Sequence, residues 1–161
     1  MTLWNHPDAS ALQRPLGMVD RDTIRDQAGT RISLFPQVRE VLAELQRRGI
    51  LLSVCSWNYT QPVMDMLGLF GISHYFRHPK AEPHPDKAGM IARTLADFER
   101  EGVHLAPEHV LFTDDRTLHN AEIQARLPGL HLLQMWVDVP DHRGLLTWLD
   151  GDADGHTLRK A

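Results

Sequence analysis

Two adjacent carboxylates, Asp114 and Asp115, end an apolar run in the second half of the chain. The run at residues 109–113 is too short for a helix, and a new helical pattern begins after the acids, so the run predicts a buried strand. The carboxyl ends of parallel strands form the crevice where open α/β sheets bind ligands, and hard oxygen ligands at that place suit Mg²⁺. The alternative is that one aspartate only caps the following helix. The pair marks either a cation site or a helix start.

Two further polar residues follow apolar segments in the same way. Ser56 comes after the continuous apolar stretch at residues 50–55, and Lys87 stands at the start of a long helical pattern. Each of these residues alone is a weak signal, but both stand at strand ends, where the crevice of an open α/β sheet binds ligands. Taken alone, Ser56 could simply open a turn, and Lys87 could be an ordinary solvated helix residue. Their order after successive strands favours the chemical interpretation.

A regular alternation of strands and helices is needed to position these side chains. Helical patterns cover residues 36–48, 61–70, 86–102, 117–126 and 144–149, and strand patterns cover residues 50–55, 74–76, 109–113 and 130–137. This alternation predicts an α/β fold with a three-layer, doubly wound parallel sheet and right-handed crossovers. Residues 18–34 alternate instead as a β-hairpin with its turn at 26–29, and residues 82–85 predict a turn. We expect one domain over residues 1–150 and a disordered polar tail at 151–161.

Composition excludes several classes of function. The 161 residues are 42% hydrophobic, which is ample for one core, and the net charge of −4 offers no basic surface for nucleic acid or an anionic membrane. The single cysteine, Cys55, excludes an intrachain disulfide, and its buried strand disfavours the thiolate of a cysteine phosphatase. Without a signal peptide or an apolar span of membrane length, the chain is predicted to be cytoplasmic. Its oligomeric state is open.

The order of these motifs resembles a known superfamily. Ser56, Lys87 and Asp114-Asp115 resemble motifs two, three and four of the haloacid dehalogenase (HAD) superfamily, and Thr2-Leu-Trp4 with the hairpin at residues 18–34 is similar to its magnesium-dependent phosphatase group. The resemblance covers residues 2 to about 139. It implies a HAD-like Rossmannoid sheet with a small hairpin flap in place of a large cap domain.

The resemblance also implies an activity, a Mg²⁺-dependent phosphomonoester hydrolase that acts through an aspartyl-phosphate intermediate. By this carry-over Ser56 binds the transferring phosphoryl group and Lys87 holds the phosphate and the nucleophile together. Asp115 is the direct Mg²⁺ ligand, with Asp114 beside it. Thr2, Trp57 and Asn58 are candidates for substrate contact, although an aromatic residue such as Trp57 is more often core or rim packing. The expected substrate is a small phosphate ester or a phosphoprotein, selected by the hairpin flap.

The sequence departs from the family pattern at its first motif, D-x-D-x-T. Thr2 matches the threonine, so the nucleophilic aspartate and the acid/base aspartate both fall before Met1, as does the apolar strand that leads into them. In this superfamily that strand lies in the middle of the sheet, and its loss leaves two ladders of unpaired backbone groups. We therefore expect a truncated chain or a misplaced start, and no phosphatase activity from the 161 residues alone.

Two other interpretations remain open. The chain could be a catalytically inactive HAD-like module that binds a phosphorylated ligand or a partner protein. It could also be a phosphorelay receiver, which uses an acidic pair, a hydroxyl residue and a lysine on a similar sheet. In a receiver the acidic pair follows the first strand and the lysine comes last, and this chain has the opposite order.

Overall fold

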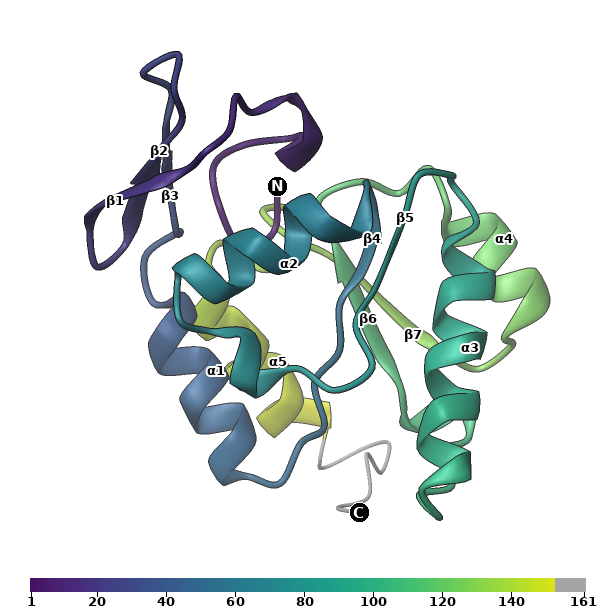
Figure 1. The fold of residues 1–161 in the computed structure, drawn as a ribbon. Helices are drawn as coiled ribbons and strands as arrows, with labels where there is room; N and C mark the ends of the chain where they lie inside the picture. The colour runs from purple at the N-terminus through teal and green to yellow at the C-terminus, as the bar shows by residue number, and fades with distance from the viewer. Residues whose placement is uncertain (153–161) are drawn as a thin grey trace.

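The computed structural model describes residues 1–152, in which helices flank short parallel strands and a three-stranded antiparallel sheet lies to one side (Figure 1). The helices are α1 (Val38–Arg47), α2 (Thr60–Leu69), α3 (Lys87–Arg100), α4 (Asn120–Arg126) and α5 (His142–Asp152). The strands are β1 (Gly17–Asp20), β2 (Thr23–Arg25), β3 (Arg31–Ser33), β4 (Cys55–Trp57), β5 (Lys80–Glu82), β6 (Leu111–Asp114) and β7 (His131–Gln134). Within the described part of the chain, no helix combines the length and the apolarity needed to cross a membrane.

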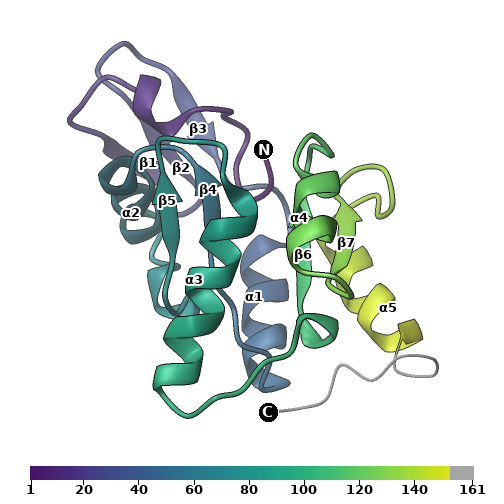
Figure 2. The same cartoon turned by 90° about the vertical axis from the view of Figure 1, so that its right-hand side faces the viewer.

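The parallel strands form two separate pairs. β4 pairs with β5, with Ser56 opposite Ala81, and β6 pairs with β7, with Phe112 opposite Leu132. Helices α3 and α4 lie on one side of these strands, and α1, α2 and α5 lie on the other, as Figures 1 and 2 show. The predicted three-layer α/β fold is confirmed. In the described residues no strand joins the two pairs.

Helix α1 shows why the periodic patterns are reliable guides. Val38, Val41, Leu42 and Leu45 recur at helical spacing and are all buried in the structure. The helix ends just before Gly49, whose φ of +76° is the left-handed conformation that stops a helix. α1 therefore lies inside the predicted range, and its apolar face packs beside α5.

The predicted strand at residues 74–76 is wrong. Residues Ser73–Tyr75 form a 3-10 turn, and the strand that pairs with β4 is β5, at the edge of the predicted turn. Only Ala81 of β5 is buried, so its Lys-Ala-Glu sequence carries no apolar signal. Its polar side chains are neutralised by α3, because Lys80 contacts Asp97 and Glu82 accepts from Arg93. This strand is determined by its pairing with β4, and such pairing leaves no periodic signal in the sequence.

The hairpin region is larger than predicted, with three antiparallel strands instead of two. The predicted turn between β2 and β3 is present, and the Asp26 carboxylate accepts hydrogen bonds there from Thr30 N at 2.8 Å and from Gln13 N at 3.0 Å. Ile24 and Ile32 lie opposite each other and are fully buried. The turn thus packs against the segment around Gln13, and its role in substrate choice stays a prediction.

The carboxyl-terminal helix is longer than predicted. α5 begins at His142 and extends to Asp152, so residues 151 and 152 of the predicted tail are helical. The rest of that predicted tail, residues 153–161, lies outside the described residues. The assignment of residues 1–150 to one domain stays a prediction.

Candidate active site

A cavity of about 780 Å³ lies between β4 and β6. Its walls are apolar in the middle of the molecule, where Leu42 of α1 and Ile91 of α3 line it, and polar at the carboxyl ends of the strands. All seven residues that the sequence singled out line this central cavity: Thr2, Ser56, Trp57, Asn58, Lys87, Asp114 and Asp115. Their convergence comes from the shared direction of the strands, whose carboxyl ends meet at one edge.

Lys87 is the most constrained of these residues. It is the first residue of α3 and is only 6% exposed. Its Nζ donates a hydrogen bond to the Cys55 carbonyl at 2.7 Å and lies 3.4 Å from Asp114 Oδ2. Burying an ammonium is costly unless it is paired, so these contacts hold the side chain toward the cavity. The alternative of an ordinary solvated lysine is wrong.

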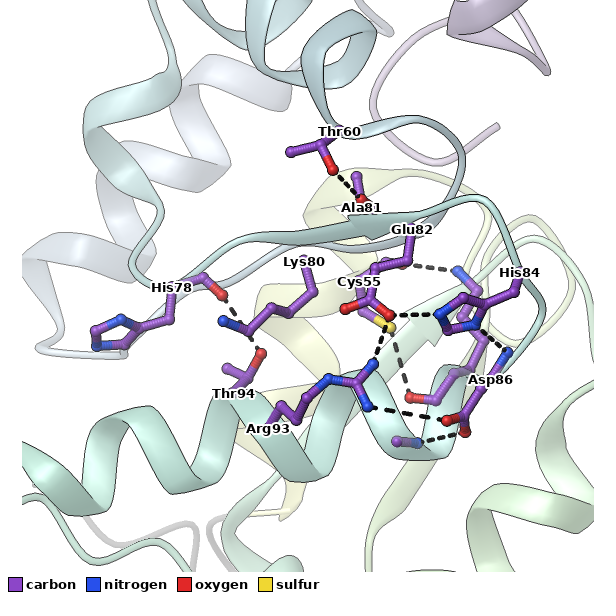
Figure 3. A network of polar contacts seen from close by, with 12 residues as sticks. Cys55, Thr60, His78, Lys80, Ala81, Glu82, His84, Asp86, Arg93 and Thr94 are labelled. Atoms are coloured by element: carbon purple, nitrogen blue, oxygen red, sulfur yellow. Dashed lines mark hydrogen bonds and ion pairs between the residues drawn. The ribbon is translucent and has the colours of Figure 1, made fainter.

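A network of charged side chains fixes the loop that leads into Lys87 (Figure 3). Glu82 pairs with His84 at 2.7 Å and with Arg93 at 2.5 Å. Asp86 caps α3 by accepting from Gly89 N at 2.7 Å, and Arg126 of α4 donates to the same carboxylate at 2.6 Å. The Gly89 backbone hydrogen bond, with help from Arg126, lowers the pKa of Asp86, so its capping carboxylate stays charged. This network positions the start of α3.

Cys55 lies next to Lys87, where burial disfavours its thiolate form. Burial raises the pKa of its thiol to about 11. The Sγ atom lies 3.7 Å from the Lys87 carbonyl, to which it donates. A thiol with this pKa is protonated at neutral pH, which agrees with the prediction that cysteine phosphatase chemistry is absent.

Asp114 and Asp115 end β6 at the polar mouth of the central cavity. Asp114 faces Lys87, and Asp115 contacts the amino group of Met1. Burial raises the pKa of Asp115, but the hydrogen bond and charge of the Met1 ammonium outweigh burial and lower it. Neither acid caps α4, because that helix begins later, after His119 and without a side-chain cap. The helix-cap alternative is therefore wrong for this pair.

Ser56, Trp57 and Asn58 lie along the facing edge of the mouth. Ser56 lies inside β4 and not after it, which corrects the predicted boundary. Trp57 is 47% exposed, and its ring meets His119 edge-on at 6.0 Å between centroids, so it is a rim residue and not part of the core. Asn58 Nδ2 donates to Asp8 at 3.3 Å, which brings the segment after Thr2-Leu-Trp4 over the same edge.

Two residues that sequence reasoning missed hold the amino-terminal segment at the mouth. Trp136 Nε1 donates to the Met1 carbonyl at 3.1 Å, and His142 Nε2 donates to the Thr2 carbonyl at 2.7 Å. Trp136 has a left-handed φ of +71°, and His142 is only 3% exposed. Both come from the loop between β7 and α5 or its end, and no periodicity or motif marks them. These two hydrogen bonds to backbone carbonyls place Met1 beside Asp115.

Comparison with known proteins identifies the family. The chain matches the family model described as acid phosphatase over residues 1–128. It belongs to the acid phosphatase family. The chain is also 34% identical over 91 residues to pyrophosphatase PpaX of Oceanobacillus iheyensis, a match that covers 52% of this chain and 39% of that protein. The resemblance to HAD phosphatases is thereby confirmed.

A solved structure supports the same fold. A haloacid dehalogenase-like hydrolase of Streptococcus pneumoniae superimposes with a TM-score of 0.54 at 24% identity, covering 73% of this chain and 53% of that chain. The HAD-like fold is thereby shown. This acid phosphatase family member spans about half or less of the length of these two relatives.

Proposed function

We propose that this chain carries most of the active site of a Mg²⁺-dependent phosphomonoester hydrolase that acts through an aspartyl-phosphate intermediate. The observation that carries the proposal is the buried ammonium of Lys87, which bridges the two strand pairs between Cys55 O and Asp114. Family membership supports the reaction class. The proposed substrate is a small phosphate ester or a phosphoprotein.

The acidic pair fits Mg²⁺ better than a metal that needs an all-protein cage. Mg²⁺ is commonly bound by one or two carboxylates and completes its shell with waters and substrate phosphate. Asp114 and Asp115 offer that set, and within residues 1–152 no group of three His, Cys, Asp or Glu side chains could hold a metal. We assign direct ligation to Asp115, as the family resemblance implies, with Asp114 beside it in contact with Lys87. A bound Mg²⁺ would neutralise charge on the phosphoryl oxygens.

The remaining residues supply donors and substrate contacts. We propose that Ser56 donates its hydroxyl to the transferring phosphoryl group and that Lys87 stabilises the negative charge of phosphate and nucleophile. Thr2, Trp57 and Asn58 line the same mouth and are proposed to contact the substrate. Trp57 offers an exposed ring at the rim for the organic part of an ester.

The nucleophile belongs to the part of the family pattern that comes before Thr2. In D-x-D-x-T both acids precede Met1, and the sequence here contains neither. Met1 lies against Asp115, so residues joined to its amino side would lie near the acidic pair. We propose that such residues supply the nucleophile and the general acid/base.

The test is a chain extended before Met1 by an apolar strand that ends in Asp-x-Asp, compared with the same extension ending in Asn-x-Asn. With p-nitrophenyl phosphate and Mg²⁺, we expect turnover only from the Asp version, with a difference on the order of 10⁴-fold or more. Chelation of Mg²⁺ should abolish it. Equal turnover by the two versions would contradict the proposal. A folded Asp version that binds Mg²⁺ without turnover would favour the inactive ligand-binding module instead.

A further inference from the structure

The loop between β6 and α4 carries a buried imidazole that the proposed reaction does not use. Asn120 N donates to Thr117 O at 3.0 Å, so this loop closes in a turn just before α4. Within the turn Leu118 is 71% exposed, whereas His119 is only 8% exposed and lines the central cavity. The turn therefore sends its apolar side chain to solvent and its polar one inward, the reverse of the usual distribution.

The ring nitrogens of His119 lack protein partners. The ring takes part in an aromatic contact, but within residues 1–152 neither nitrogen forms a hydrogen bond or an ion pair. The polar atoms that are fully enclosed without a partner in this part of the chain belong to Gln37, His78 and His142. The nitrogens of His119 therefore still touch accessible space, although the residue is buried. Because a buried polar group is costly without a partner, this state favours a ligand that completes its hydrogen bonds.

His119 lies at the mouth of the cavity, where the two strand pairs meet. Its ring meets that of Trp57 edge-on, with 6.0 Å between centroids, and Trp57 is 47% exposed. Trp57 directly follows Ser56 in β4. His119 comes four residues after Asp115, on the side of β6. The organic part of a phosphate ester bound between Ser56 and the acidic pair would lie beside these two rings.

Arg116 adds a permanent positive charge to the same loop. Its side chain is 58% exposed and lines the central cavity. In the described chain its guanidinium forms no hydrogen bond, and its Nε lies 3.9 Å from Asp115 Oδ2. Asp8, the carboxylate beside Asn58, is engaged by Ser10 as well. The guanidinium, which stays charged throughout the physiological pH range, is therefore open to an anion of the substrate.

We propose that Arg116 and His119 form a second anion subsite beside the phosphoryl site, and that the substrate is a phosphate monoester whose short organic part carries a carboxylate. This inference rests on the proposed function and deepens it by naming the substrate class. A guanidinium and an imidazole N–H suit a carboxylate, which accepts two hydrogen bonds. A second phosphate would bring more negative charge beside Asp114 and Asp115, which like-charge repulsion disfavours.

Both residues stand within four positions of Asp115, so the two anions of the substrate are separated by only a few atoms. The exposed ring of Trp57 packs against the carbon atoms between them.

The first experiment titrates the 161-residue chain, with Mg²⁺ present, with two non-hydrolysable probes. 4-Phosphonobutyrate carries both anions, and its carboxamide replaces the carboxylate by a neutral group of the same shape. NMR gives the affinity of each probe and follows the ring signals of His119. We expect 4-phosphonobutyrate to bind about tenfold more tightly than the carboxamide and to shift those signals. Equal affinities, absence of binding, or binding that leaves the His119 signals unmoved overturns the proposal.

Matched variants locate the preference for the carboxylate. Arg116→Gln and His119→Phe should each bring the two affinities to within about threefold of each other, because each removes one donor. His119→Gln keeps a donor and should retain part of the preference. His109→Phe is the control, since His109 lines the same cavity at the amino end of β6 and should keep the full preference.

The exposed position of Arg116 keeps this test decisive if His119→Phe does not fold. A preference that survives Arg116→Gln, or that is lost equally in His109→Phe, overturns the subsite.

The extended Asp-x-Asp protein separates this proposal from the catalytic one. Its kcat/KM is measured for the phosphate esters of 3-hydroxypropionate and of 3-hydroxypropionamide. If the probes bind as expected and neither ester is hydrolysed, the anion subsite stands and the catalytic proposal fails. If both esters are hydrolysed with equal kcat/KM and the probes bind equally, the catalytic proposal stands and the anion subsite fails.

Discussion

The two parallel strand pairs present opposite chemistry at one edge of the molecule. The β4–β5 pair and the helix that follows it bring a hydroxyl, an amide and an ammonium from Ser56, Asn58 and Lys87. The β6–β7 pair brings the two carboxylates of Asp114 and Asp115. Donors suit phosphate oxygens and carboxylates suit a hard cation. Each pair alone therefore offers half of the proposed phosphoryl-transfer site, so the proposed function depends on how the two pairs are placed relative to each other.

Lys87 is the contact that joins the two chemistries. Its Nζ touches the backbone of one pair and a carboxylate of the other, at Cys55 O and Asp114 Oδ2. The loop before it is held by ion pairs of Glu82 and Asp86 with Arg93 and Arg126. The amino-terminal segment is held separately by Trp136 and His142. The relation between the two strand pairs can therefore be tested at Lys87, at the acidic pair, or at either set of supporting contacts.

The largest effect is expected at Lys87, which contacts both strand pairs. In the extended Asp-x-Asp protein, Lys87→Ala should lower turnover by roughly 10²–10³-fold, because a preorganised charge at the transferring phosphoryl group is lost. The free energy of unfolding should fall much less, by about 1–2 kcal/mol. Turnover and melts are measured on the same preparation. Lys80→Ala is the matched control, since Lys80 pairs with Asp97 and does not line the cavity. A large loss of Tm with near-normal turnover would make Lys87 a structural residue.

The next largest effect is expected to distinguish the two carboxylates of the proposed cation site. Asp115→Asn keeps the shape of the side chain but loses the charge that holds a hard cation, so the Mg²⁺ concentration for half-maximal turnover should rise about tenfold or more. Asp114→Asn should shift it less, because Asp114 is already engaged by Lys87. Titration of activity against Mg²⁺ for both variants of the extended protein measures this. Equal or reversed shifts would refute the ranking.

A smaller effect is expected at the Asp86 cap, which supports the start of α3 beside the β4–β5 pair. A Cβ added at Gly89 would lie 2.0 Å from Asp86 Oδ2, so Gly89→Ala must displace the cap of α3 and should cost about 1–2 kcal/mol. Gly68→Ala in α2 is the matched control, because its added Cβ meets nothing within 4 Å and should stabilise the helix by up to about 1 kcal/mol. Urea unfolding of both variants tests the contrast. Similar changes of the same sign would show that the cap does not depend on Gly89.

The smallest expected effect is a pH dependence of stability that comes from His142, which holds the amino-terminal segment. Burial lowers the pKa of His142 below its ordinary value of 6.5, despite the hydrogen bond to Thr2 O. The unfolded chain therefore binds the proton more readily, and this contribution to stability is present above pH 6.5 and is lost as the pH falls through the folded-state pKa.

Urea unfolding at several pH values between 5 and 7.5 measures that slope. His142→Gln should flatten it, whereas replacement of the exposed His74 by Gln should leave it as it is. An unchanged slope in His142→Gln would assign the pH dependence to other groups.

Much of this molecule could be predicted from residue order and periodicity. The apolar faces of α1 and α3 repeat at helical spacing, and the short apolar run before Asp114 predicts β6, because burial of one stripe or one run is a local property. The site residues could also be found, since polar residues at strand ends converge in any parallel sheet. Strand β5 could not, because Lys80 and Glu82 are neutralised by side chains of α3 that lie far along the chain.

The sequence by itself determined the fold class and which side chains gather at one edge, because both follow from local burial and from the direction of parallel strands. Only the tertiary structure decided that Lys87 is buried between the two strand pairs, and that Trp136 and His142 hold the first two carbonyls of the chain. It also decided that β4 and β6 face each other across an apolar cavity. These features depend on contacts between residues more than twenty-five positions apart. The energies of such contacts are set by desolvation and backbone pairing and leave no periodic trace in the sequence.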